Sequence, residues 1–378
     1  MSWLITGTGA VSSIGGTVAD MFDALRAGRS GVAPHRGFDP GRFRARNAYE
    51  IDDRPVGVLD APGRTTNWLV EAIDQAVRDA GLDDRLDDVP ILVGTTQREM
   101  RSVELHWRDG VPLDPRDAHF GTALSRRFGA GATYTVGNAC AASLYALGLA
   151  TDLLDLDAAD TVVVAGADTI TESIYGLLDR CYPLPPDAVR PFDRNRRGMI
   201  QGDGAAAVVL QRDAPGRGAR TRLRGVEVNC DAVHPSAPDT GNIACTMRQA
   251  HARAGLHPRD VDLILLHGTG TVLNDDAEAE AVGEVFAGVD PFPRTTAIKS
   301  MTGHTAGASG LHSLITAVES LRTSTVTPTV GVDDPIEAVS GLRLVRDRAE
   351  RAELAVAQVN SFGFGGLNAV ALVEEVRG

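Results

Sequence analysis

The sequence has no excess of positive charge, no long hydrophobic run and no positively charged leader at its start. The net charge of −13 argues against general nucleic-acid binding, because such binding needs a basic surface that displaces counterions from phosphates. The longest apolar runs, at 161–167 and 205–210, are far shorter than the ~18 residues that indicate a membrane span. We therefore expect a protein that neither binds nucleic acid nor crosses a membrane, and whose first residues form a strand and turn rather than a signal peptide.

Cysteine is also scarce, and its spacing excludes two common uses. The four cysteines, at positions 140, 181, 230 and 245, form no CxxC pair. Neither a zinc knuckle nor a disulfide framework is therefore indicated. We expect no bound metal, and reduced thiols in a cytoplasmic protein.

Lysine is nearly absent. Of the 37 lysine and arginine residues, only Lys299 is a lysine. A lysine kept for solubility would be interchangeable with arginine, which the sequence uses everywhere else. Lys299 is therefore expected where a compact ammonium fits and a planar guanidinium does not, with a buried structural lysine as the alternative.

Short β-rich apolar runs alternate with longer helical segments, which predicts an α/β protein. The 378 residues are enough for one large core or two fused cores, since single cores stop growing at about 250–300 residues. Strands are expected at 3–7, 91–95, 161–167, 205–211, 223–228, 262–268, 353–359 and 369–375. Helices are expected at 65–81, 142–156, 243–255, 275–286 and 310–321.

The two halves of the sequence look alike. A glycine turn runs into a terminal strand at 202–210 and again at 363–372. The run 161–169 has a counterpart in 262–271, and each ends in a glycine-bearing loop. Glycine, proline and arginine concentrate at 212–222, where we place the join. The sequence therefore predicts a duplication, with an N-terminal half at 1–215 and a C-terminal half at 216–378.

Cys140 precedes a run with apolar residues on nearly every face, so it is expected at the start of a deeply buried helix. A helix N-terminus presents unpaired N–H groups and positive potential, which favours thiolate over thiol. The alternative is a cysteine packed in the core.

Three further segments carry polar groups in positions that favour chemistry. His267 ends an apolar strand, where α/β proteins bind ligands, although a structural histidine is the alternative. The glycines after it do not lead into a GK[ST] sequence, so a nucleotide site is not favoured. Lys299 and His304 stand five residues apart among glycines that let backbone approach closely. The glycine turn at 360–369 is suited to aiming backbone N–H groups at an oxyanion.

Together and in this order, these segments resemble the β-ketoacyl synthases, the condensing enzymes of fatty acid and polyketide synthesis. The resemblance runs along most of the chain. It is carried by "WLITGTGAVSSIG", "ACAASLYALGLA", "VRPFDRNRRGMIQGDGAAAVVL", "HGTGTVLNDDAEAEAV", "IKSMTGHTAGASG" and "NSFGFGGLNA". Each motif is modest support by itself, and the six in order are specific.

The resemblance implies a thiolase-like fold, in which two similar halves stack into five α-β-α-β-α layers. It also implies that Cys140 is the nucleophile and that His267 and His304 are paired histidines supported by Lys299. Phe364 matches the gating phenylalanine, and its backbone N–H with that of Cys140 would form an oxyanion hole. Further implied substrate-binding residues are Thr269 and Thr271, on the phosphopantetheine arm, and Gly363 and Gly365.

The implied reaction accounts for these residue types. A thiolate attacks an acyl thioester and holds the chain as a new thioester. A malonyl unit then loses its carboxylate, and the resulting enolate needs the donors that two histidines supply. The cation of Lys299 is expected to anchor the hydrogen-bond network around His304. The resemblance thus implies a β-ketoacyl-[acyl carrier protein] synthase of the elongating Cys-His-His class, in polyketide or other specialised fatty-acyl biosynthesis.

The implied partners are an acyl carrier protein and a second subunit, either identical or a related ketosynthase-like chain. No cofactor is expected beyond the phosphopantetheine of the carrier, which holds the substrates. Because carriers are acidic, docking on this acidic chain needs a local basic patch, with a solvated charged face as the alternative. The candidates are Arg64, Arg190, Arg194, Arg196 and Arg197, with the pair Arg126 and Arg127.

The chain departs from the family pattern at a few positions. Asn138 stands where many relatives have threonine or serine, and Ala141 and Ala142 replace hydroxyl residues. Ser313 replaces an acidic residue nine positions beyond His304, so Lys299 is expected to lack its usual counter-charge. Leu367 replaces a threonine. These changes bear on substrate and chain length more than on reaction type.

Three alternatives are kept beside the synthase. The first is a non-catalytic chain-length-factor subunit, which would lack the nucleophile. The second is an acyltransferase that passes the acyl group to an oxygen or nitrogen nucleophile without decarboxylation, for which one base is enough. The third is a thiolase or an initiating synthase, which typically pairs histidine with asparagine where this chain has His304.

Overall fold

The computed structural model describes residues 3–54, 60–212 and 221–376. The first half of the chain contains β1 (Trp3–Ser12), α1 (Val18–Arg26), β2 (Ala33–Pro34), η1 (Pro40–Arg42), β3 (Asn47–Ala48), α2 (Arg64–Asp79), β4 (Ile91–Gly94), α3 (Met100–Asp109), η2 (Pro115–Ala118), α4 (Phe120–Phe128), β5 (Thr133–Val136), η3 (Ala139–Ala141), α5 (Ala142–Asp155), β6 (Thr161–Asp168), α6 (Glu172–Cys181) and β7 (Gly204–Arg212). The second half contains β8 (Thr221–Cys230), α7 (Thr240–Ala254), η4 (Pro258–Asp260), β9 (Leu263–Leu265), α8 (Val272–Val285), β10 (Arg294–Thr296), α9 (Lys299–Thr302), η5 (Ala306–Ala308), α10 (Ser309–Thr323), β11 (Thr325–Val326), η6 (Glu337–Val339), β12 (Arg343–Leu344), β13 (Glu350–Arg351), β14 (Val356–Gly363) and β15 (Leu367–Glu375). Elements labelled η are 3₁₀ helices.

All eight strands and five helices that the sequence predicted are present: β1, β4, β6, β7, β8, β9, β14 and β15, and α2, α5, α7, α8 and α10. Three strands of the main sheet, β5, β10 and β12, were not predicted. Their sequences, Thr-Tyr-Thr-Val, Arg-Thr-Thr and Arg-Leu, are short and carry few apolar residues, so hydrophobic periodicity does not detect them.

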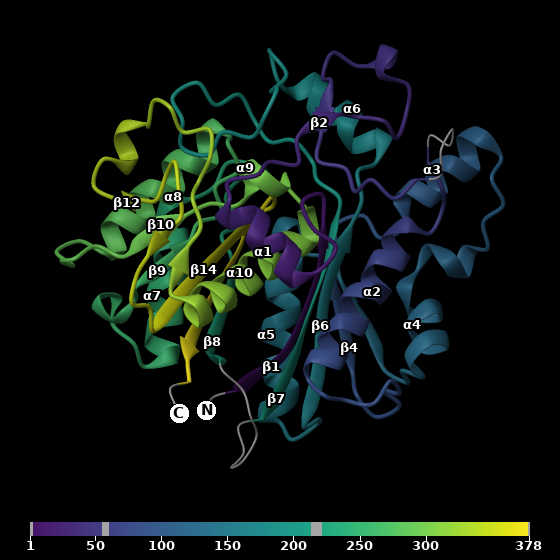
Figure 1. The fold of residues 1–378 in the computed structure, drawn as a ribbon, viewed down its shortest axis with the longest axis horizontal. Helices are drawn as coiled ribbons and strands as arrows, with labels where there is room; N and C mark the ends of the chain where they lie inside the picture. Colours follow the sequence, from purple (N-terminus) through teal and green to yellow (C-terminus); the bar gives the residue numbers. More distant parts are fainter. Residues whose placement is uncertain (1–2, 55–59, 213–220, 377–378) are drawn as a thin grey trace.

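The two halves share one strand order (Figure 1, where the first half is purple to teal and the second green to yellow). The order is β5-β4-β6-β7-β1 in the first half and β10-β9-β14-β15-β8 in the second, with β12 added beside β10. In each set the first three strands run parallel and the last two join antiparallel. The predicted duplication is therefore present as a repeat of topology.

One predicted correspondence between the halves was wrong. The sequence paired the run that forms β6 with the run that forms β9. By position in the strand order, β9 corresponds to β4, and β6 corresponds to β14. A glycine-bearing loop after an apolar strand is a local pattern that recurs at several strands, so it does not identify the equivalent one. The predicted pairing of β7 with β15 is correct.

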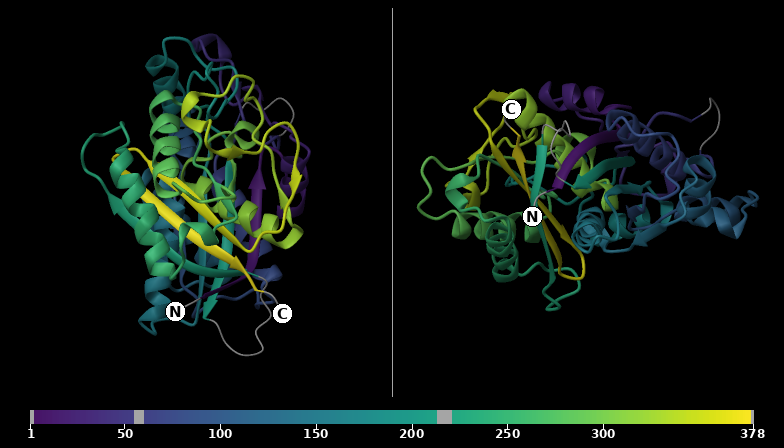
Figure 2. Two further views of the ribbon diagram at one scale, coloured as in Figure 1. Left: turned by 90° about the vertical axis from the view of Figure 1, so that its left-hand side faces the viewer. Right: turned by 90° about the horizontal axis from the view of Figure 1, so that it is seen from below.

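The helices α5 and α10 form the layer between the two sheets. Both helices contact strands of both halves, and every residue of α10 from Ser309 to Leu321 is buried. On the outer faces, α2 packs on β1, β6 and β7, and α7 packs on β8, β15 and α8. The strand sets of the two halves are continuous as one 11-stranded sheet, because Trp3–Ile5 of β1 pairs with β8. Figure 2 gives two further views of this layered arrangement. This is the five-layer arrangement that the sequence predicted.

The predicted join at 212–222, with its boundary at 215/216, falls almost entirely outside the described residues. Within the described ranges, no helix has both the length and the apolar character needed to cross a membrane.

Candidate active site

Cys140 lies where β5 meets the central helix α5, inside the short helix η3. The preceding residue, Ala139, has a φ of 46°, which turns the chain sharply into the helix. The hydroxyl of Ser361, on β14, donates to the carbonyl of Cys140 at 3.0 Å. A strand of the second half, β14, therefore helps to hold Cys140, the candidate nucleophile, in place.

The thiol of Cys140 is less acidic than predicted. The residue is partly exposed, but the surrounding protein desolvates the sulfur and raises the pKa of Cys140 to about 11. Lys299 and the backbone N–H groups of Phe364 and Cys140 lower this pKa without offsetting the burial. The predicted bias of the helix terminus toward thiolate is therefore outweighed by desolvation of the sulfur.

His304 lies two residues before η5, which precedes α10 in the second half as η3 precedes α5 in the first. The helix η5 begins at Ala306 with a φ of 46°, the same value as at Ala139 before α5. The backbone N–H of His304 donates to the carbonyl of Ile200 at 2.9 Å, and its carbonyl accepts from Gly202 at 3.0 Å. The mid-chain segment 199–203 therefore positions His304, a function that the sequence did not indicate.

Lys299 contacts His267 directly. Its Nζ lies 3.2 Å from Nδ1 of His267 and donates to the carbonyl of the same residue at 2.5 Å. Both side chains are buried. Since an ammonium only donates, Nδ1 of His267 accepts and Nε2 carries the proton.

This contact corrects the predicted role of the lysine. Lys299 was expected to anchor the hydrogen bonds around His304, and it anchors those of His267. Within the described part of the chain, both ring nitrogens of His304 are buried without a hydrogen-bond partner. The rings of His267 and His304 are 5.5 Å apart, edge to face. Burial lowers the pKa of both histidines well below its ordinary value, and Lys299 adds to this effect.

The counter-charge of Lys299 comes from α8 and not from position 313. Burial lowers the pKa of Lys299 to about 8, and Glu278 opposes this shift more than Cys140 or Asp275 does. The carboxylate of Glu278 accepts the backbone N–H groups of His267 at 2.7 Å and Gly268 at 2.8 Å. Position 313 therefore offers Lys299 no counter-charge, as expected, and Glu278 supplies one instead.

Asp275 holds the rest of the loop that follows β9. Its carboxylate accepts the N–H groups of Thr269 at 3.0 Å, Gly270 at 3.2 Å and Phe192 at 2.8 Å. Asp275 and Glu278 were not predicted as site residues. Their spacing of three residues, at the start of a helix beside a glycine-rich loop, is the signal that would have identified them.

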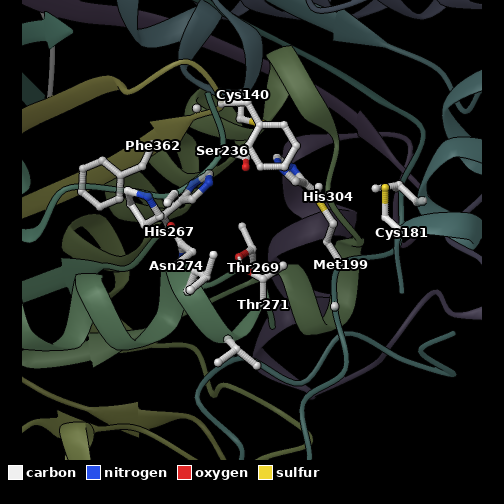
Figure 3. Close-up of a pocket in the computed structure, with 18 of the residues that line it drawn as sticks. Cys140, Cys181, Met199, Ser236, His267, Thr269, Thr271, Asn274, His304 and Phe362 are labelled. Carbon is white, nitrogen blue, oxygen red and sulfur yellow. Dashed lines mark hydrogen bonds between the residues drawn. The ribbon is translucent and has the colours of Figure 1, made fainter. Parts of the chain in front are cut away.

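A cavity of about 530 Å³ brings the predicted residues together. It is lined by Cys140, His267, His304, Thr269, Thr271, Gly363 and Phe364, with apolar residues that include Leu178, Met199, Val272 and Phe362. Figure 3 shows Cys140, His267 and His304 around the same space, with the two threonines further along it. Phe364 is 52% exposed at the cavity mouth. Gly365 does not line the cavity, and its N–H donates to the carbonyl of Pro235 at 2.8 Å.

Two arginines of the predicted docking set lie too deep to meet a partner. Arg64 is 7% exposed and bonds to Asp53 and Asp60, and Arg196 is 9% exposed and bonds to Asp276. These buried contacts stabilise the fold, so we remove both residues from the docking set.

The other candidate arginines remain at the surface. Arg197 is exposed and lines the cavity. Arg190 pairs with Asp187, Arg194 is exposed and pairs with Asp334, and Arg127 pairs with Asp74.

All four cysteines are free thiols, as predicted. Among the described residues, no group of three or more histidine, cysteine, aspartate or glutamate side chains is placed to hold a metal ion.

The fold and the Cys-His-His cavity define a thiolase-like condensing protein, and comparison with known proteins identifies its family. The family model "Beta-ketoacyl synthase, N-terminal domain" matches residues 4–215, and "Beta-ketoacyl synthase, C-terminal domain" matches residues 220–333. The chain belongs to the β-ketoacyl synthase family.

Individual relatives of this chain support the same family assignment. The chain is 30% identical to "3-oxoacyl-[acyl-carrier-protein] synthase 2" of Coxiella burnetii, covering 99% of this chain and 98% of that protein. A solved structure, "The ishigamide ketosynthase/chain length factor", is 34% identical with a TM-score of 0.89 and covers 100% of this chain and 99% of its own. An acyl-carrier-protein complex of a type II polyketide ketosynthase shares the fold at 22% identity, with a TM-score of 0.86, over 100% of this chain and 99% of its own.

Proposed function

We propose that the chain is a β-ketoacyl-[acyl carrier protein] synthase, which condenses an acyl thioester with malonyl-carrier and releases carbon dioxide. The observation that carries the proposal is the shared cavity of Cys140, His267 and His304, with Lys299 behind His267. Specialised metabolism, polyketide synthesis in particular, is the proposed setting, supported by the similarity to the ishigamide protein.

In the first step the sulfur of Cys140 attacks the acyl carbonyl carbon. A new C–S bond forms, the bond to the carrier thiol breaks, and the proton of Cys140 leaves with that thiol. The backbone N–H groups of Cys140 and Phe364 both face the sulfur of Cys140 and lower the pKa of its thiol. From this position they donate to the oxyanion of the tetrahedral intermediate.

In the second step malonyl-carrier loses its carboxylate. The electrons of the broken C–C bond form an enolate, whose oxygen gains negative charge. His267 offers Nε2–H because Lys299 occupies Nδ1. His304 offers a ring N–H that no described residue engages. The two histidines therefore donate to the enolate oxygen.

In the third step the enolate carbon attacks the thioester on Cys140. A C–C bond forms, the C–S bond to Cys140 breaks, and the expelled thiolate takes up one proton. The raised pKa of the Cys140 thiol favours this protonation and returns the enzyme to its starting form.

The proposed partners are an acyl carrier protein and a second ketosynthase-like subunit, identical or related. Relatives named as acyl-carrier-protein synthases and as a ketosynthase/chain length factor pair support both. The proposal includes no cofactor beyond the phosphopantetheine of the carrier. A cytoplasmic location belongs to the proposal and is supported by the free thiols.

Two of the alternatives lose support from the site itself. A chain-length-factor subunit would lack the nucleophile, and Cys140 is present in the cavity. An acyltransferase needs one base, and this cavity holds two histidines.

Intact-mass spectrometry tests the proposal. We expect a panel of acyl-carrier thioesters to load one acyl group on Cys140, and malonyl-carrier then to remove it with release of carbon dioxide. Cys140→Ser should not be loaded, whereas the matched variant Cys245→Ser, changed on α7, should load normally. Loading without carbon dioxide release would favour the acyltransferase, and no loading of the wild type would favour the non-catalytic subunit.

The docking surface has its own test. Arg194→Glu with Arg197→Glu should raise the apparent KM for carrier about tenfold while kcat changes little, because rim charges act mainly on encounter. Arg85→Glu, an exposed arginine paired with Asp87, is the matched control. An unchanged KM would remove this patch from the proposal.

A further inference from the structure

A chain of buried side chains leads from α7 to the catalytic lysine and histidine. Nε2 of His251 lies 2.7 Å from Oε1 of Gln358, and Nε2 of Gln358 donates to Oδ1 of Asn360 at 2.8 Å. Nδ2 of Asn360 donates to Oε1 of Glu278 at 3.0 Å. His251, Gln358, Asn360 and Glu278 are all buried. None of the steps above uses His251, Gln358 or Asn360.

Only one orientation of this chain satisfies every hydrogen bond. An ionised Glu278 only accepts, so Asn360 must present its NH₂ group to it. The carbonyl of Asn360 then faces the NH₂ group of Gln358, and the carbonyl of Gln358 faces His251. Nε2 of His251 must therefore carry the proton. All donors point toward Glu278, the acceptor that ends the chain.

Glu278 also binds the loop that carries His267, and its negative charge acts on Lys299. It accepts the backbone N–H groups of His267 and Gly268. The charged and titratable groups facing Lys299 are Glu278 and Asp275 from α8, Cys140 from η3, His312 from α10, and the rings of His267 and His304. Asp275 also faces Glu278, and Asp260 faces His251. Among these groups, Glu278 does most to keep Lys299 protonated.

Gln358 links His251 to Asn360, so the two residues are more than an isolated polar pair. Replacing Gln358 by an apolar group leaves the buried carbonyl of Asn360 without its donor. Both residues lie where apolar packing surrounds them, and His251 meets the ring of Phe286 edge to face at 5.6 Å. The pair therefore calls for a role other than filling the core.

We propose that His251 and Gln358 are positioning residues, which orient the amide of Asn360 so that it donates to Glu278 and thereby keeps Lys299 in its protonated, donating state. Without Gln358, the carbonyl of Asn360 loses its donor, and the amide is no longer held in place against Glu278. Its hydrogen bond to Glu278 then weakens, and the ionised form of that carboxyl is less stabilised. The inference rests on the proposed function only for its effect on catalysis.

The single lysine of the chain makes a direct test possible. Labelling with ε-¹³C-lysine yields one signal, from Lys299, and its titration reports the state of that amine without any substrate. We expect the wild-type midpoint near 8. In Gln358→Leu the midpoint should fall by up to about one pH unit, because the weakened donor acts on Glu278 and reaches Lys299 through the charge of that carboxylate.

Matched variants separate positioning from packing. His251→Leu should lower the midpoint in the same direction, and His251→Gln, which keeps a donor near Nε2, should leave it near the wild-type value. Gln211→Leu is the control, because Gln211 is a buried glutamine at the far end of β7 that bonds to Thr161. An unchanged midpoint in folded Gln358→Leu, or an equal shift in Gln211→Leu, overturns the proposal. If Gln358→Leu does not fold, the two His251 variants decide it.

The same variants have a catalytic readout. The basic limb of malonyl-carrier decarboxylation should move to lower pH in Gln358→Leu by the shift seen for the lysine signal, with little change in KM. A wild type that releases no carbon dioxide would end the proposed function and leave the lysine titration as the test of the positioning chain.

Discussion

At the scale of single residues, the lone lysine is explained by its surroundings. Nζ of Lys299 is enclosed and reaches both a ring nitrogen and a carbonyl of His267. A guanidinium is larger and planar, and it would place its donors elsewhere. The absence of lysine from every other position marked a site in which arginine cannot replace it.

Lys299→Arg should lower kcat about 100-fold, because a small displacement of a catalytic group carries a cost of that order. The protein should still fold, with the secondary structure by circular dichroism unchanged. Steady-state rates with acyl-carrier and malonyl-carrier measure the loss. Full activity in the Lys299→Arg enzyme would contradict the assigned role.

The pH dependence of Cys140 tests its environment. Since the pKa of the thiol is raised to about 11, the thiolate fraction grows throughout the neutral range. The rate of alkylation by iodoacetamide should therefore rise steadily from about pH 7 to about pH 9, as followed by intact mass. A plateau near neutral pH would mean that the thiolate is the resting form.

At the scale of elements, the site depends on strands and helices that touch without side chains between them. A Cβ on Gly94 of β4 would lie 2.4 Å from the backbone nitrogen of Ser143, so α5 rests directly on this strand. A Cβ on Gly307 would lie 2.6 Å from Cα of Thr95, and its N–H donates to buried Asp168 at 2.7 Å. These contacts bring the turns before α5 and α10 to one place.

Gly363, at the end of β14, tests this closeness. A Cβ there would lie 3.2 Å from the backbone nitrogen of Cys140 and 3.3 Å from that of Ala141. Gly363→Ala should hinder the oxyanion donors and slow acyl loading about 100-fold, the usual cost of losing one donor. Single-turnover loading by mass spectrometry measures it. Gly283→Ala, in α8 with open space around the Cβ, should load at the wild-type rate.

At the scale of the whole molecule, β5 is the edge of the sheet, and no described strand covers its outer side. Its inner pairing uses the carbonyls of Ala132 and Val136, so the N–H of Thr135 points outward. Tyr134 is largely exposed on the same strand. An uncovered edge of this kind is a template for pairing with a second chain.

Thr135→Pro should therefore weaken the subunit contact, because proline removes an outward donor from the ladder. Light scattering after size exclusion should give twice the mass of one chain for the wild type and one chain for the variant. If the variant remains a dimer, the subunits meet elsewhere.

The sequence predicted a large part of this arrangement for identifiable reasons. The strands with continuous apolar runs and the long buried helices were found because burial imposes a periodicity that a single sequence carries. Cys140, His267, Lys299 and His304 were singled out because the motifs that carry them, taken in order, resemble those of the β-ketoacyl synthases. The strands β5 and β10 were missed because they are short and polar.

What the sequence alone determined was the set of proposed reacting groups, the duplication and the family, since these depend on residue identity and order along the chain. The tertiary structure decided which groups touch. It assigned Lys299 to His267 and Glu278, enclosed Arg64 and Arg196 in ion pairs, and made the Cys140 thiol a weak acid. Contacts, burial and the resulting charge states depend on distances between segments far apart in the chain, and no spacing along a sequence records those distances.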